Sequence, residues 1–145
     1  MIDYKTIQKI LPQSSPFILI DKIIDFKKGE SLTAIKNITG NEWIFDEGAL
    51  AGCSSIFPET LLIEAAAQAA LVLYGLTNLQ PADKQPQYIL GRSKAEFENF
   101  VYIGDQITLS AVASKMLDTG GYSDIKLSKT SQNIGTIEII YKVIR

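Results

Sequence analysis

The chain has 145 residues, of which 46% are hydrophobic and 21% are charged. This balance predicts one globular domain, residues 1–145, and excludes a disordered or fibrous chain. The net charge of −2 and the scattered lysines exclude the basic stripe that nucleic-acid binding requires. With one cysteine and no histidine, we expect no internal disulfide, no structural metal and no cofactor.

The beginning of the chain carries no targeting pattern. The stretch "MIDYKTIQKILP" lacks the charged and then apolar order of a signal peptide. No stretch reaches the roughly 18 uninterrupted apolar residues of a membrane span. The sequence therefore predicts a cytoplasmic protein without a membrane span.

The first predicted elements are a short helix and a hairpin. Residues 3–10 have a weak amphipathic pattern that predicts a helix, which the turn "PQSSP" closes. Residues 17–26 are rich in β-branched and aromatic side chains, and "KKGE" separates them from a second strand-like segment, residues 31–39. Together these two segments predict a β-hairpin.

Residues 54–76 have the length and the alanine and leucine content of a long helix. Pro58 suits its first turn, and Gly75 lies near its end. The segment is apolar around most of its circumference, so we expect it to be buried on most sides. Glu64 and Gln68 nevertheless lie near its centre. Burial of a carboxylate is costly unless it is hydrogen-bonded or paired, so Glu64 is a candidate functional residue.

The last third of the chain predicts a β-meander. Residues 106–114 and 135–144 alternate apolar and polar side chains, and residues 122–129 lie between them, separated by turns. A single helix among strands can be buried on most sides only where a curved sheet wraps it, so the predicted fold class is α+β. A second copy of the chain would then cover the remaining helix face and the sheet edge.

Three segments carry longer motifs. Residues 11–23 follow L-P-H-R-x-P-F-x-L-[IV]-D, residues 58–68 follow the second half of G-H-F-P-G-x-P-x-x-P-G-V-x-x-x-E-A-x-A-Q, and residues 97–109 follow F-x-x-P-V-x-P-G-D-Q-L. The matching positions are Leu11, Pro12, Pro16, Phe17, Leu19, Asp21, Pro58, Glu64, Ala65, Ala67, Gln68, Phe97, Val101, Gly104, Asp105, Gln106 and Leu109. In this content and order the chain resembles the FabZ-type 3-hydroxyacyl-[acyl carrier protein] dehydratases.

The resemblance implies the hotdog fold, in which an antiparallel sheet wraps a long central helix. It also implies a homodimer, or a trimer of dimers, and a substrate whose acyl chain is carried by acyl carrier protein or coenzyme A. In the family, the helix glutamate and the motif histidine face each other across the dimer interface, at the bottom of an acyl tunnel. Glu64 matches that catalytic glutamate, which would explain an acid inside the helix.

The chain departs from the family in the first half of the main motif. Fourteen residues before Glu64, the histidine position falls on Leu50, and the chain has no histidine elsewhere. We expect Leu50 to fill that end of the pocket. The residues that follow, which in the family help to bind the thioester carbonyl, are Ala51, Gly52 and Cys53. Ser55 and Glu59 replace two further motif residues.

These departures leave three functions open. The first is a hydro-lyase of the dehydratase type, which would need a second acid–base group. The second is an acyl thioesterase in which Glu64 activates water or attacks, with backbone N–H groups around Cys53 and Ser54 holding the carbonyl. The third is a non-catalytic acyl-binding protein, or a subunit that pairs with a histidine-bearing homologue. In each case Leu50, Cys53, Ser54 and Gln68 are the candidate substrate-binding residues.

Overall fold

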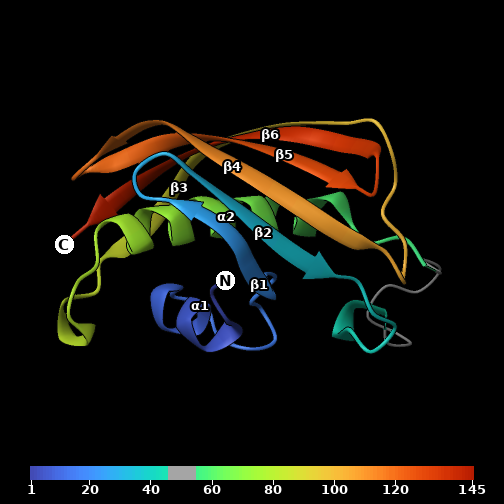
Figure 1. Ribbon diagram of the computed structural model, residues 1–145, viewed down its shortest axis with the longest axis horizontal. Coiled ribbons are helices and arrows are strands. Elements are labelled where there is room, and N and C mark those ends of the chain that lie inside the picture. Colours follow the sequence, from blue (N-terminus) through green and yellow to red (C-terminus); the bar gives the residue numbers. More distant parts are fainter. Residues whose placement is uncertain (46–54) are drawn as a thin grey trace.

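The computed structural model describes residues 1–45 and 55–145 (Figure 1). The helices and strands of this part are α1 (Tyr4–Ile10), β1 (Lys22–Lys27), β2 (Ser31–Asn37), α2 (Glu59–Thr77), β3 (Gln87–Phe97), β4 (Gln106–Leu117), β5 (Gly120–Lys129) and β6 (Gln132–Ile144). Short 3-10 turns lie at Trp43–Phe45 and Ala82–Lys84.

The strands form one antiparallel sheet in the order β1-β2-β4-β5-β6-β3. The last three strands of the chain are neighbours, as the predicted meander requires. β3 pairs with β6 and β1 pairs with β2, so β3 and β1 are the two edges of the sheet.

The helix α2 lies beneath the curved sheet and extends in the same direction as the long strands β5 and β6, while α1 lies on the opposite side of α2 (Figure 1). The helix α2 is buried on every side from Ala65 to Tyr74. Its buried residues are Leu62, Ala65, Ala66, Ala67, Gln68, Ala69, Ala70, Leu71, Val72, Leu73 and Tyr74. By length and composition alone α2 could span a membrane, but most of it is buried inside the protein. Its apolar composition is therefore that of a core helix.

The predicted elements exist, but two of them begin later than expected. The first hairpin strand starts at Lys22 rather than at Phe17, because the backbone of residues 17–19 bonds to the side chain of Gln68 instead of to a strand. The long helix starts at Glu59, with Pro58 as its N-cap in an extended conformation. Of the residues predicted to be helical before it, Ser54 lies outside the described residues, whereas residues 55–58 are not helical, and Ile56 instead forms a β-bridge with Tyr102.

The strand β3 is the element that the sequence patterns do not delimit. Most of its side chains are exposed, including Ile89 and Leu90, so it lacks the alternation of apolar and polar residues by which half-buried strands are recognised. Its place in the sheet comes from pairing with β6, which is about 45 residues away in the sequence.

Close packing of β3 on β6 depends on Gly135. A Cβ atom at this position would lie 2.4 Å from the backbone oxygen of Glu96 on β3. We expect Gly135→Ala to lower the free energy of unfolding by about 1–3 kcal/mol, because one of the two strands must shift. Gly40→Ala, where the new Cβ would meet only the side chain of Ile103 at 3.9 Å, is the control and should change it by less than about 0.5 kcal/mol. If urea denaturation gave the same free energy of unfolding for the two variants, this packing would be contradicted.

Candidate functional site

Glu64 lies on the second turn of α2 and is partly buried. Its Oε1 accepts two hydrogen bonds, one from Nε2 of Gln13 at 3.0 Å and one from Nε2 of Gln68 at 2.9 Å. Gln68 follows four residues later, so the two side chains lie on the same face of the helix. Gln13 comes from the loop after α1. The carboxylate is therefore fixed by two amide groups from different parts of the chain.

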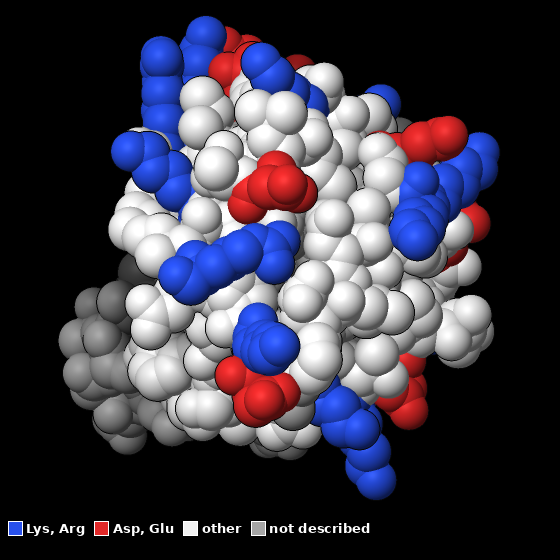
Figure 2. All heavy atoms as spheres, turned by 90° about the vertical axis from the view of Figure 1, so that its left-hand side faces the viewer, with Lys and Arg blue, Asp and Glu red and all other residues white. Residues whose placement is uncertain are grey.

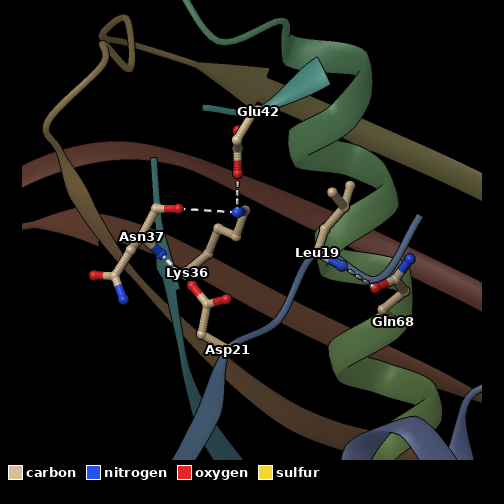
Figure 3. A network of polar contacts seen from close by, with 6 residues as sticks. All are labelled: Leu19, Asp21, Lys36, Asn37, Glu42 and Gln68. Atoms are coloured by element: carbon tan, nitrogen blue, oxygen red, sulfur yellow. Dashed lines mark hydrogen bonds and ion pairs between the residues drawn. The ribbon is translucent and has the colours of Figure 1, made fainter. Parts of the chain in front are cut away.

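Gln68 is completely buried, with 0% of its surface exposed. Its Oε1 accepts the backbone N–H of Leu19 at 2.8 Å, as Figure 3 shows, and its Nε2 donates to the backbone oxygen of Phe17 at 2.7 Å. Because the Leu19 N–H can only donate, the oxygen of the Gln68 amide must face it, and the NH₂ group must face Glu64. Gln68 thus joins the N-terminal segment to the helix and orients Glu64.

The two amide donors assign different roles to the oxygens of Glu64. Oε1 receives N–H groups from both Gln13 and Gln68, so it can act only as an acceptor. Within residues 1–45 and 55–145, Oε2 receives no such bond. Any proton that Glu64 takes up or releases is therefore carried by Oε2, and this is the oxygen available for chemistry.

A cavity of about 90 Å³ adjoins Glu64 between α2, β3 and β6. Its walls are mostly apolar, and the residues that line it are Pro12, Gln13, Glu64, Ala67, Leu71, Tyr88, Leu90, Ile139 and Tyr141. Leu90 lies on the edge strand β3 and is half exposed, so the cavity reaches the rim of the sheet. An apolar lining with one oriented carboxylate is the chemistry of a small-molecule site, although the cavity is smaller than the several hundred Å³ usual for such sites.

A larger open groove of about 700 Å³ lies at the C-terminal end of α2, where Lys28, Asp118 and Arg145 are among its lining residues. Figure 2 views this end of the molecule and shows positive and negative side chains interspersed over it. The groove does not include Glu64 or Gln68. We therefore take the smaller cavity as the candidate site.

Of the residues predicted for the site, Glu64 and Gln68 are brought into direct contact. Leu50, Cys53 and Ser54 lie outside the described residues, so their predicted roles stay predictions. The residue that the sequence reasoning missed is Gln13. The sequence did contain a signal for it. Gln13 stands where the motif of residues 11–23 has its histidine, and a polar residue at such a position is a candidate for the site.

Two acidic residues of the motifs have structural roles. Oδ2 of Asp21 accepts the backbone N–H of Asn37 at 2.6 Å (Figure 3). Oδ2 of Asp105 accepts the backbone N–H of Tyr102 at 2.8 Å and pairs with Lys129 at 2.7 Å. Burial tends to raise the pKa of Asp105, but the hydrogen bonds from Lys129 and Tyr102 hold it below its ordinary value.

A buried ion pair joins Lys36 to Glu42, and Nζ of Lys36 also donates to the backbone oxygen of Asn37 at 2.9 Å (Figure 3). This pair fixes the chain just after β2. The hydrogen bond from the backbone N–H of Asn37 to Asp21 connects β2 to the N-terminal segment, whose residues 17–19 bind Gln68. In the described part of the chain no cluster of acidic, cysteine or histidine residues could hold a metal ion.

An antiparallel sheet around a central helix, with a carboxylate beside an apolar cavity, is the arrangement expected of a hotdog-fold protein. Comparison with known proteins identifies its family. The family model for a FabA-like domain matches residues 11–135. The 3-hydroxyacyl-[acyl-carrier-protein] dehydratase FabZ of Shewanella denitrificans is 42% identical over 107 residues, which are 73% of this chain and 69% of the relative. The corresponding enzyme of Koribacter versatilis is 41% identical over 109 residues, 75% of this chain and 68% of the relative. The chain belongs to the FabA-like family and is a FabZ dehydratase-like protein of fatty-acid metabolism.

A longer relative contains the same region as one part. The bifunctional enzyme LpxC/FabZ of Chlorobaculum tepidum is 38% identical over 128 residues, and this chain, 87% of which is matched, spans about a quarter (26%) of that protein.

The solved structures confirm the predicted hotdog fold. The dehydratase heterocomplex ApeI:P from Xenorhabdus doucetiae matches with a TM-score of 0.80 at 12% identity, over 96% of this chain and 91% of that chain. The uncharacterised protein PH1136 from Pyrococcus horikoshii matches with a TM-score of 0.66 at 16% identity, over 100% and 96%. At these identities the likeness concerns the fold alone.

Proposed function

We propose that this protein binds 3-hydroxyacyl thioesters, carried by acyl carrier protein or coenzyme A, and contributes Glu64 to their dehydration as a hydro-lyase subunit. The observation that supports this most is the carboxylate of Glu64, which two amides orient, which lines an apolar cavity and which matches the catalytic glutamate of the family motif. The cytoplasm, where acyl thioesters are made, is the proposed location.

Dehydration needs two proton transfers. A base takes a proton from C2 of the substrate, an acid protonates the hydroxyl on C3, and water leaves as the C2–C3 double bond forms. Oε2 of Glu64 can serve the hydroxyl, because Oε1 is occupied by the amide donors. The same oxygen cannot also act as the base for C2 in the same step, so a second group is required.

We infer that the second group comes from another chain, because this one contains no histidine, the residue that most often serves in general acid–base catalysis. We propose that a histidine-bearing homologue supplies it in a mixed dimer. Two observations favour this arrangement: β3 is an exposed edge strand beside the cavity, and the similar structure of ApeI:P is named as a dehydratase heterocomplex. A dimer of identical chains, or a trimer of such dimers, would use the same edge but would lack the histidine.

Complementation tests this function. A FabZ-type homologue from the same organism, with its own helix glutamate replaced by glutamine, keeps its histidine but has lost its acid. Intact mass spectrometry of a 3-hydroxyacyl carrier protein then scores the loss of water. We expect little turnover from either protein alone and turnover well above their sum from the mixture, together with a mixed oligomer in native mass spectrometry.

Other outcomes identify the alternatives. Release of free acid by this chain alone would identify a thioesterase. Two proteins of this fold are named so: a hypothetical thioesterase from Streptococcus pneumoniae, with a TM-score of 0.64, and PA1618 from Pseudomonas aeruginosa, with a TM-score of 0.63. Loss of water with this chain alone would show that the histidine is dispensable. No turnover and no mixed oligomer would contradict the proposal and favour a non-catalytic acyl-binding protein.

A further inference from the structure

The cavity beside Glu64 leads from the carboxylate into the core of this chain. Glu64, Ala67 and Leu71 line it and share one face of α2, so the cavity follows that face for about 10 Å. Leu71 is only 7% exposed, and Ile139, which lines the cavity from β6, is fully buried. The inner end of the cavity is therefore closed by core residues of the chain itself.

Tyrosine rings complete the wall at this inner end. Tyr88 of β3 and Tyr141 of β6 line the cavity, and each ring packs edge-on against Tyr74 of α2, with centroids 6.0 Å and 5.8 Å away. Tyr74 lies three residues beyond Leu71, so the rings meet on the side away from Glu64.

Contacts behind the wall hold it in place. The hydroxyl of Tyr74 accepts a hydrogen bond from Nη2 of Arg145 at 3.1 Å and donates to a backbone oxygen of the loop between β4 and β5 at 3.4 Å. The hydroxyl of Tyr141 lies against Gly121 of β5, where an added Cβ would come within 2.5 Å of it. The hydroxyls of Tyr88 and Tyr141 are both buried, so these residues offer ring carbons to the cavity. A close-packed aromatic wall of this kind resists displacement.

The size of the cavity limits what it can hold. Its volume is about 90 Å³. One water molecule takes roughly 30 Å³ in the liquid and a methylene group takes a similar space, so the cavity has room for about three carbon atoms. The proposed function places the C3 hydroxyl of the substrate at Glu64, and these carbons would follow C3.

We propose that this protein is specific for short acyl chains, of about six carbon atoms or fewer, and that Leu71 sets this limit. The proposal rests on the proposed function, since it requires that the acyl chain enters the cavity beside Glu64. A longer chain cannot leave its surplus carbons in water at a closed end. It has to withdraw its thioester from Glu64 or displace the wall, and both disfavour binding.

Calorimetric titration with acyl pantetheines tests this limit without any need for turnover, because saturated acyl chains have no hydroxyl to lose. In the unmodified protein we expect the affinity to rise from acetyl through butanoyl to hexanoyl pantetheine, as more apolar surface is buried. Octanoyl and decanoyl pantetheine should then bind about ten-fold more weakly than hexanoyl.

Two variants test the positions that line the cavity. Leu71→Ala removes part of the closed end, so octanoyl should bind at least as tightly as hexanoyl pantetheine. Ala67→Leu fills the cavity one turn after Glu64, so it should weaken hexanoyl binding about ten-fold and change acetyl binding by less than about two-fold. Leu79→Ala is the control, because Leu79 is exposed in the larger groove, and it should leave the whole length series unchanged.

The outcomes separate the two proposals. If decanoyl binds as tightly as hexanoyl pantetheine in the unmodified protein, the limit is wrong although the acyl site stands. If no acyl pantetheine binds to the folded protein, the acyl site itself fails and the limit with it. If folded Leu71→Ala keeps the original limit, the assignment of Leu71 is wrong. The length series in the unmodified protein decides the limit even where a variant does not fold.

Discussion

Glu64→Gln is expected to lower the rate of water loss in the complemented assay by about 10²–10⁴-fold, the usual contribution of one acid–base group. The substitution is close to isosteric. The new amide oxygen can still accept from Gln13 and Gln68, and the new NH₂ group takes the place of Oε2, which accepts no hydrogen bond from the described residues. Only the ability to exchange a proton is lost.

Because the contacts are retained, binding of the thioester should change little, so the loss should appear in kcat rather than in KM. Glu59→Gln is the matched control, since Glu59 lies on the same helix but is exposed in its first turn. It should retain full activity in the same mass-spectrometric assay. An unchanged rate for Glu64→Gln in a folded mixed dimer would remove Glu64 from the chemistry.

Gln68→Leu is expected to lower the free energy of unfolding by about 2–4 kcal/mol, although the two side chains have similar size. Gln68 is fully buried and satisfies the N–H of Leu19 and the oxygen of Phe17 at the same time. Leucine can satisfy neither group, and no other element is placed to replace it among the described residues. The segment that carries Gln13 to Glu64 would loosen as well.

Urea denaturation at a fixed protomer concentration measures this effect, since stability of an oligomer depends on concentration. Gln8→Leu is the control, because Gln8 is an exposed residue of the helix α1. It should change the free energy of unfolding by less than about 0.5 kcal/mol. If Gln68→Leu were equally mild, the bonds from Gln68 to the N-terminal segment could not be what holds Glu64 in place.

Sequence patterns predicted the elements that bury many apolar side chains, either on one face, as in the strands, or on all sides, as in the helix. The strands β4, β5 and β6 and the helix α2 each bury a definite set of apolar side chains, so their alternation or apolar length was visible. The spacing of four residues likewise placed Gln68 one helical turn after Glu64, on the same face of the helix.

Tertiary structure alone decided the rest. The strand β3 is mostly exposed and owes its position to backbone pairing with β6, which leaves no pattern in its side chains. The contact of Gln13 with Glu64 joins residues 51 positions apart, and only the folding of the N-terminal segment onto α2 creates it. The chain thus determined by itself its core helix, its meander and the acid at its centre. The partners of that acid and the walls of its cavity depended on long-range packing, because local sequence patterns report burial and not which distant groups meet.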